Sequence, residues 1–356
     1  MSNTFRELLK KVGSGTHTGK DLSREEAEIA TRMMLLGEAT PAQIGAFLIA
    51  HRIKRPTSEE LAGMLDAYDQ IGPQLQSWGM GKLPDSSSSH PITVLGTPYD
   101  GRDRTAPVTI LTALMLAAAG VPVLMHGGDR IATKYGIPLM EIWQGLEVDL
   151  SKLSLEKVQL LLEKIGLGFI YLPQHFPEAE GLVTYRDQIG KRPPIATMEL
   201  IWSPYLGAIH QVAGYVHPPT EVRFREVFNM RGVNNFTLVK GLEGSCDLPC
   251  DRTAIIAISN PNTSEGFERL ILHPSDYGFA AKEVPFESTS QLIGQLQAVL
   301  TGKSSELLNA AIWNGGFYLW RCGVCEDLPT GFAKAQNLLS GGYTENKLTE
   351  IKNAID

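Results

Sequence analysis

The stretch Val94–Thr105 reads VLGTPYDGRDRT, and it decides how the rest of the chain is interpreted. The apolar run PITVLG leads into a glycine-containing turn, and a helical pattern follows from about Pro107 to Ala119. Unpaired backbone N–H groups and a helix dipole converge at such a turn, which is where many proteins hold phosphates. Pro98 and Tyr99 occupy the turn where two glycines would leave more N–H groups free. The stretch predicts strand, turn and helix, and leaves open whether the turn is a phosphate cradle.

Outward from this unit, strand-like and helix-like segments alternate toward the C-terminus. The segment VPVLMHGG follows the helix as the next strand, and the tail from Gln291 onward returns to helices. The further strand candidates are GFIYL (168–172), HQVAGYV (210–216), FTLVKG (236–241) and TAIIAI (253–258). This order predicts an α/β domain with a mostly parallel central sheet and helices on both faces. Ligands are then expected at the carboxyl ends of the strands.

The first seventy residues have a different, helical character. Apolar residues recur at helical spacing, and three capping boxes mark helix starts: Ser23 with Glu26, Thr40 with Gln43, and Thr57 with Glu60. Between Gly72 and Pro91 the pattern dissolves into Gly, Pro and the run Ser86–Ser89, which reads as a flexible connection. We therefore expect a helical domain over 1–75 and an α/β domain over 76–356, with part of 160–205 returning to the helical domain.

Composition bounds the class of protein. The 356 residues are 43% hydrophobic, which is ample for a globular core, and no secretory signal opens the chain. The longest apolar stretch, Val108–Met125, is interrupted by Gly120 and Pro122, so a buried helix and strand explain it better than a membrane span. The net charge of −7 argues against a surface that is basic throughout, although a local basic groove stays open. A cytoplasmic protein without a membrane partner is expected.

Two close cysteine pairs are the only hint of a structural metal. Cys246 with Cys250 and Cys322 with Cys325 could resemble a tetrahedral zinc site. The alternative is four ordinary reduced cysteines, because Cys322 and Cys325 lie in the apolar stretch FYLWRCGVCEDL.

The order of several motifs resembles the anthranilate phosphoribosyltransferase family, from about Phe5 to Ala335. The motifs are AFLIAHRIK, GTPYDG, AAAGVPVLMHGGDR, ATKYG, RDQIGKRPP and LLNAA. The resemblance implies the fold that this family shares with pyrimidine nucleoside phosphorylases, and a homodimer formed through the N-terminal helices. It also implies a ribose-phosphate ligand, with Mg²⁺ where such phosphates are bound.

Residue by residue, the resemblance assigns a set of phosphate and substrate positions. The family's GTGGDG loop stands here as Gly96, Thr97, Pro98, Tyr99, Asp100 and Gly101, so the paired glycines are replaced. Of the family's Asn-x-Ser-Thr stretch in the helix after the loop, this chain keeps only a hydroxyl, that of Thr109. The family's KHGN motif keeps His126 and Gly127 but loses its lysine. Thr133 and Lys134 echo a Ser-Ser-Lys segment, and Arg192 matches the anthranilate-contacting arginine. The resemblance thus implies an altered phosphate site.

The metal and acceptor positions also differ from the family pattern. The adjacent Asp-Glu pair that holds Mg²⁺ in the family falls on Cys246 and Asp247, which leaves Asp247, with Glu243 as a second candidate ligand, as a weaker site. Glu199 would repel an acidic aromatic substrate if it faced the pocket. Anthranilate is therefore not the expected substrate.

Other residues allow both a functional and a structural interpretation. Arg102 and Arg104 could grip phosphate, or form a solvated turn with Asp103. His126 could be a ligand or acid/base, or a hydrogen-bonded structural residue. The run 51–55 could present charge to nucleic acid, or be a solvated helix end. The aromatic residues could stack on bases or form core: Trp313, Phe317, Tyr318 and Trp320.

Two functions from different classes follow from these observations. The first is a phosphoribosyltransferase-like enzyme that acts on a ribose-phosphate compound other than the usual partners of anthranilate. The second is a catalytically inactive homodimer, resembling a divergent branch of the family, that binds single-stranded nucleic acid with little sequence preference. The missing glycines, lysine and acidic pair favour the second, whereas the acidic net charge opposes it.

Overall fold

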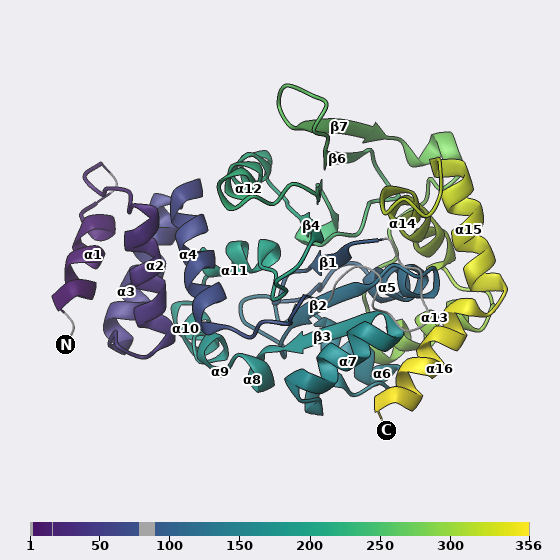
Figure 1. The fold of residues 1–356 in the computed structure, drawn as a ribbon, viewed down its shortest axis with the longest axis horizontal. Coiled ribbons are helices and arrows are strands. Elements are labelled where there is room, and N and C mark those ends of the chain that lie inside the picture. The colour runs from purple at the N-terminus through teal and green to yellow at the C-terminus, as the bar shows by residue number, and fades with distance from the viewer. Residues whose placement is uncertain (1–2, 16, 78–89, 356) are drawn as a thin grey trace.

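The computed structural model describes residues 3–15, 17–77 and 90–355, and Figure 1 shows a helical domain beside a larger α/β domain. The predicted connection around Ser86–Ser89 lies outside the described residues. The helical domain is formed by α1 (Asn3–Gly13), α2 (Arg24–Leu35), α3 (Pro41–Lys54) and α4 (Ser58–Ile71).

All three predicted capping boxes are confirmed at the starts of helices. Ser23, Thr40 and Thr57 each accept a hydrogen bond from the backbone N–H three residues later, and the side chain there accepts one from the cap's N–H. These reciprocal bonds satisfy backbone groups that a helix start otherwise leaves unpaired. Inside the bundle, the rings of Phe5 and Phe47 pack with centroids 5.4 Å apart. Local sequence therefore fixes where three of the four helices begin.

A seven-stranded sheet forms the centre of the α/β domain, in the order β3-β2-β1-β4-β5-β6-β7. The strands are β1 (Ile92–Gly96), β2 (Val123–Gly127), β3 (Leu167–Tyr171), β4 (Ile209–Gly214), β5 (Phe236–Val239), β6 (Ala254–Ser259) and β7 (Phe267–Leu272). Strands β1 to β5 run parallel to one another. Strand β6 pairs antiparallel with β5, and β7 pairs antiparallel with β6. The predicted fold class is confirmed, but the edge strand β7 was not expected from the sequence.

The remaining helices lie mostly around this sheet. They are α5 (Thr109–Ala118), α6 (Leu139–Gly145), α7 (Leu155–Ile165), α8 (Leu172–His175), α9 (Pro177–Glu180), α10 (Val183–Ile189), α11 (Ile195–Met198), α12 (Pro218–Arg231), α13 (Thr289–Leu300), α14 (Leu308–Arg321), α15 (Leu328–Ser340) and α16 (Tyr343–Ile355). Short 3-10 turns are η1 (Leu150–Lys152), η2 (Glu199–Ile201), η3 (Leu242–Gly244) and η4 (Pro274–Tyr277). Helix α5 packs on β2 and β3, and α14, α15 and α16 pack on α5 (Figure 1). By contrast, α10 packs on α3 and α11 contacts α4 of the helical domain.

The aromatic residues of α14 belong to the core. Trp313, Phe317 and Tyr318 are at most 1% exposed, and the Tyr318 hydroxyl donates to the Cys246 carbonyl at 2.6 Å. The core interpretation is therefore correct for these three residues, and they offer no stacking surface to a base.

Helix α12 of the α/β domain packs against α4 of the helical domain (Figure 1). Charged side chains join the two helices. Arg231 pairs with Asp66 and Asp69, and Arg24 pairs with Asp66 from the α2 side. The Ser58 hydroxyl also donates to Glu226. This network fixes the two domains relative to each other. None of the helices in the described ranges is long and apolar enough to cross a bilayer.

Candidate functional site

The glycine-containing turn lies at the carboxyl end of β1, as predicted, but its glycines are required by packing. A Cβ on Gly96 would overlap the carbonyl oxygen of Leu200. Gly101 has φ +70°, and a Cβ there would meet the backbone of Gly136. Gly127 is looser, since its nearest neighbours would be Phe169 and Tyr99 at 3.7 and 3.9 Å. Packing and backbone conformation therefore explain the glycines at positions 96 and 101 without a ligand.

Tyr99 fills the middle of the turn and bonds to His126. The Tyr99 side chain is buried, and its hydroxyl lies 2.6 Å from His126 Nδ1. His126 Nε2 lies 3.0 Å from the Trp202 carbonyl oxygen, which can only accept, so Nε2 carries the proton and Nδ1 accepts from Tyr99. Burial lowers the pKa of His126 to about 4, which keeps the ring neutral at pH 7. Both ring nitrogens are engaged within the protein.

A buried ion pair, which sequence reasoning missed, lies next to this bond. Glu199 of η2 is 1% exposed and pairs with Arg186 of α10, and the Tyr68 hydroxyl donates to Glu199 at 3.4 Å. The rings of Tyr68 and Trp202 meet edge to face, 5.6 Å apart. Glu199 was expected to repel an acidic substrate, yet its charge is compensated by Arg186. No sequence motif joined these residues, because they come from three separate elements.

Asp247 and Glu243, the two carboxylates expected to hold a metal, are occupied by the chain itself. Asp247 pairs with Arg102, accepts the Val108 N–H at 3.0 Å and accepts the Thr109 hydroxyl at 2.8 Å. It thereby caps the N-terminal end of α5. Glu243 accepts backbone N–H groups from residues 103–105 and pairs with Lys134.

The carboxylates of Asp247 and Glu243 do not fit a magnesium ion. Mg²⁺ needs free carboxylate oxygens and room for its own waters. The oxygens of Asp247 are bonded to Arg102, Val108 and Thr109, and Glu243 is bonded as described above. Cys246 stands where the family has an acidic residue, and burial raises the pKa of its thiol. Among the described residues, no cluster of three His, Cys, Asp or Glu side chains is suited to a metal, zinc included.

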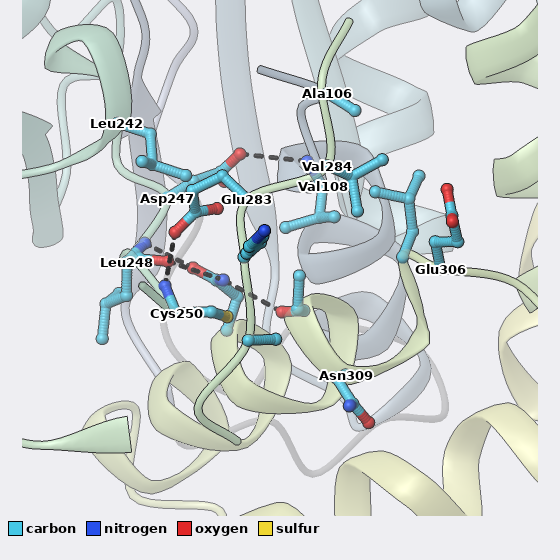
Figure 2. Close-up of a pocket in the computed structure, with 15 residues that line it drawn as sticks. Ala106, Val108, Leu242, Asp247, Leu248, Cys250, Glu283, Val284, Glu306 and Asn309 are labelled. Carbon is cyan, nitrogen blue, oxygen red and sulfur yellow. Dashed lines mark hydrogen bonds between the residues drawn. The ribbon is translucent and has the colours of Figure 1, made fainter. Parts of the chain in front are cut away.

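A small pocket lies behind Asp247, between the start of α5 and α14. Its volume is about 20 Å³, which is room for one water molecule. Figure 2 shows Asp247, Glu283 and Cys250 at its wall, with Leu248 close by. Glu283 accepts the N–H groups of Cys250 and Asp251 at 2.6 and 3.1 Å. The space is too small for a substrate.

The other predicted site residues are divided between interior and surface. Thr97 and Asp100 are buried, whereas Thr133 is exposed and the Arg104 side chain is 72% exposed. Arg102, expected as a phosphate grip, is buried and directed to Asp247 and Thr105. Of the predicted positions, only Asp247 lines the space behind it, and only Arg192 lines the groove described next.

Arg192 lines a groove between the two domains. Arg192 pairs with Asp100, and its backbone carbonyl accepts a hydrogen bond from Arg52 at 2.7 Å. The groove measures about 720 Å³. Its walls come from the end of α3, the segment before α11 and the start of α12, and its basic residues are Arg52, Arg55, Arg192, His217 and Arg223. None of the described residues that line it is acidic.

The end of α3 is held in place by a buried cluster. Glu60 is fully buried and accepts Lys54 Nζ at 2.8 Å and the Thr57 N–H at 2.7 Å. His51 Nε2 lies 3.3 Å from the same carboxylate. Burial raises the pKa of Glu60, but the bonds from His51, Leu22 and Lys54 outweigh it and lower the pKa to about 2. The basic run is therefore more than a solvated helix end, because it is anchored where it meets the groove.

Comparison with known proteins is consistent with this architecture. The glycosyl transferase family's helical bundle domain matches residues 6–72, and its a/b domain matches residues 92–345. Anthranilate phosphoribosyltransferase of Chromobacterium violaceum is 26% identical over 336 residues, 94% of each chain. The enzyme of the same name from Thermus thermophilus superposes with a TM-score of 0.77 at 20% identity, covering 99% of both chains.

A second similar solved structure is a complex with ligands. It is anthranilate phosphoribosyltransferase from Saccharomyces cerevisiae in complex with PRPP and Mg, with a TM-score of 0.81 at 15% identity. The superposition covers 100% of this chain and 98% of that one. At these identities the structural likeness establishes the fold, whereas the two domain matches span most of the sequence. This chain therefore belongs to the glycosyl transferase family that includes the anthranilate phosphoribosyltransferases.

Proposed function

We propose that this chain keeps the scaffold of its family without efficient phosphoribosyl transfer to anthranilate, and that it binds single-stranded nucleic acid through the interdomain groove. The groove carries the proposal: four arginines and His217 face a space of about 720 Å³ whose described lining holds no carboxylate. Nucleic acid affinity without sequence preference rests on such contacts between cations and phosphates. The acidic residues that give the chain its negative net charge do not line this groove.

Loss of the transfer reaction is supported by the filled turn. A departing pyrophosphate needs donors that are already in place, and removal of one such donor typically slows a reaction about 100- to 1000-fold. Pro98 has no N–H, and the Tyr99 side chain is buried against His126. Asp247 and Glu243 are bonded internally, so neither is free for Mg²⁺. The nucleic-acid proposal does not involve a metal.

The groove is held open by the surrounding contacts. Helix α12, which supplies Arg223 and the edge at His217, is tied to α4 by Arg231 and its two aspartates. A preformed groove costs less ordering on binding than one that must close. A homodimer formed through the N-terminal helices would place two such grooves on one particle, which lengthens the basic track.

Fluorescence anisotropy with a labelled oligo-dT in a salt series tests this proposal. Four phosphate contacts predict that log affinity falls against log salt with a slope of roughly −3, at about 0.7 per contact. The variant Arg55→Gln with Arg223→Gln removes two contacts, and no side-chain bond is broken that the structure shows. The slope should fall to about half.

A matched control removes equal charge away from the groove. Arg252 and Lys303 are exposed and do not line it, so Arg252→Gln with Lys303→Gln should keep the wild-type slope. Equal losses in both double variants would mean that the groove is not the binding surface. An absence of any binding at 50 µM protein and low salt would refute the proposal.

A second candidate is transfer to another ribose-phosphate acceptor. Gly96, Thr97, Asp100 and Gly101 favour it, since they retain the family's positions around the turn. Isothermal titration with phosphoribosyl pyrophosphate and Mg²⁺ tests it separately. Heat at submillimolar ligand, with turnover in a scan of aromatic amine and nucleobase acceptors, would support this candidate, and no heat at millimolar ligand would exclude it.

A further inference from the structure

The groove between the domains exposes apolar side chains beside its arginines. Ile53, near the end of α3, is 63% exposed and lines the groove. Pro218 and Pro219, the first residues of α12, are also exposed and line it from the α/β domain. None of the described residues that line the groove is Phe, Tyr or Trp. The arginines account for contacts to phosphates, whereas these three apolar residues contribute nothing to such contacts.

The exposed position of Ile53 follows from the geometry of α3. The apolar residues that this helix buries are Ile44, Phe47 and Leu48. Ile53 comes about two and a half turns after Ile44, at 3.6 residues per turn, so the two side chains lie on opposite sides of the helix. Ile53 therefore cannot join the core of the helical domain. Its apolar surface leaves water only when a ligand or a second molecule covers it.

The neighbours of Ile53 hold it in place. Arg52 donates to the backbone carbonyl of Arg192 at 2.7 Å, and Lys54 Nζ donates to Glu60 at 2.8 Å. On the opposite wall, the ring of each proline fixes the backbone φ, and a proline side chain has almost no rotamer freedom to lose on burial. Apolar surface that is held in this way costs little conformational entropy when a ligand covers it.

Cationic and apolar residues follow one another along both walls of the groove. Ile53 lies between Arg52 and Arg55 in the sequence, and the two exposed prolines lie between His217 and Arg223. A single strand of nucleic acid also alternates, because charged phosphates and flat base faces follow one another along it. A duplex instead keeps its base faces inside the stack. The groove therefore matches an unpaired strand in its apolar surface as well as in its charge.

We propose that Ile53, Pro218 and Pro219 form the surface on which the bases of a bound strand lie. This inference rests on the proposed function and adds a specificity to it, since the groove then prefers strands with unpaired bases to polyanions of equal charge without bases. The arginines supply affinity for phosphates, and the apolar residues supply the preference for bases. Every base has a face that such a surface can cover, so the preference does not depend on sequence.

Two oligonucleotides of equal length and charge test the proposal, one of oligo-dT and one that is abasic at every position. Fluorescence anisotropy should show at least about five-fold tighter binding of oligo-dT, in line with the burial of apolar side chains. The two salt slopes should be equal, because both strands present the same phosphates. Equal affinities would overturn this inference and leave the proposed function standing. Absence of binding by both strands at low salt would refute both.

Substitutions of Ile53 test the position of the bases. Ile53→Ala removes most of the side chain without loss of helix propensity, and the ratio of the affinity for oligo-dT to that for the abasic strand should fall at least about two-fold. Ile53→Trp should raise the ratio at least about five-fold, because an aromatic ring stacks on bases. Ile271→Ala is the matched control, since Ile271 of β7 is 50% exposed and does not line the groove, and it should leave the ratio unchanged.

A ratio that neither Ile53 variant changes would overturn the proposal, because the bases would then lie elsewhere. Light scattering distinguishes a surface for bases from a contact between two copies of the chain. An unchanged particle mass together with a lowered ratio in Ile53→Ala supports the proposal. A changed mass together with equal losses of affinity for both strands would show that Ile53 belongs to a contact between copies, and the proposal would be wrong.

Discussion

Tyr99→Phe tests whether the turn is a structural element, because it deletes only the hydroxyl that bonds to His126. The two atoms lie 2.6 Å apart, and His126 is fully buried. With Nε2 committed to the Trp202 carbonyl, Nδ1 would be left as a buried acceptor without a donor. An unpaired buried polar group costs about 1–3 kcal/mol. We therefore expect the free energy of unfolding to fall by about 1–3 kcal/mol.

Urea denaturation followed by tryptophan fluorescence and circular dichroism measures this loss. Tyr343→Phe is the matched control, since Tyr343 is 54% exposed, and its free energy of unfolding should change by less than about 0.5 kcal/mol. A loss below about 0.5 kcal/mol for Tyr99→Phe would refute the structural role of the hydroxyl. The turn would then be free to rearrange around a ligand.

Two further predictions concern the helical domain and the turn. The pKa of Glu60 is lowered to about 2 from 4.5, so its bonds stabilise the fold above pH 4.5, and this stability, roughly 3 kcal/mol, is lost as the pH falls toward 2. Glu60→Gln should therefore flatten the stability profile between pH 5 and 2, measured by urea denaturation, and an unchanged profile would contradict the assignment. Gly96→Ala places a Cβ against the Leu200 carbonyl oxygen and should lower the free energy of unfolding by several kcal/mol, whereas the same change at Gly120, which unlike Gly96 has a positive φ but has open space around it, should cost about 1–2 kcal/mol.

Local patterns in the sequence were enough to predict the fold class and most of the strands. Three capping boxes predicted the starts of α2, α3 and α4, and the apolar runs predicted strands β1 to β6, of which the first five are parallel, since these signals depend on neighbouring residues. Strand β7 was missed because FERLIL is an edge strand with exposed Glu268 and Arg269 and has no clean alternation. Helix α12 was missed because charged and apolar residues are mixed around it.

The candidate site was predicted only in part, because its contacts join distant residues. The sequence showed that Pro98 lacks a backbone donor and that Tyr99 adds a bulky side chain to the turn, but it could not show that Tyr99 bonds to His126. Glu243 was expected as a metal ligand, whereas the fold brings residues 103–105 to it across about 140 positions of sequence. Pairing of this kind is decided by how the loops at the sheet's edge fold over one another, and single-residue patterns do not record that.

Arg186 of α10 and Glu199 of η2 form a buried ion pair beside the turn that follows β1. Both side chains are at most 3% exposed, so each depends on the other for compensation of its charge. Glu199→Gln should therefore destabilise the protein by about 3–5 kcal/mol, because it leaves a buried guanidinium without its counter-charge. The double variant Arg186→Met with Glu199→Leu should recover most of that loss, since an apolar pair of similar volume needs no compensation. Measured unfolding free energies would contradict this if the double variant were no more stable than Glu199→Gln, which would mean that the charges organise a ligand-binding space.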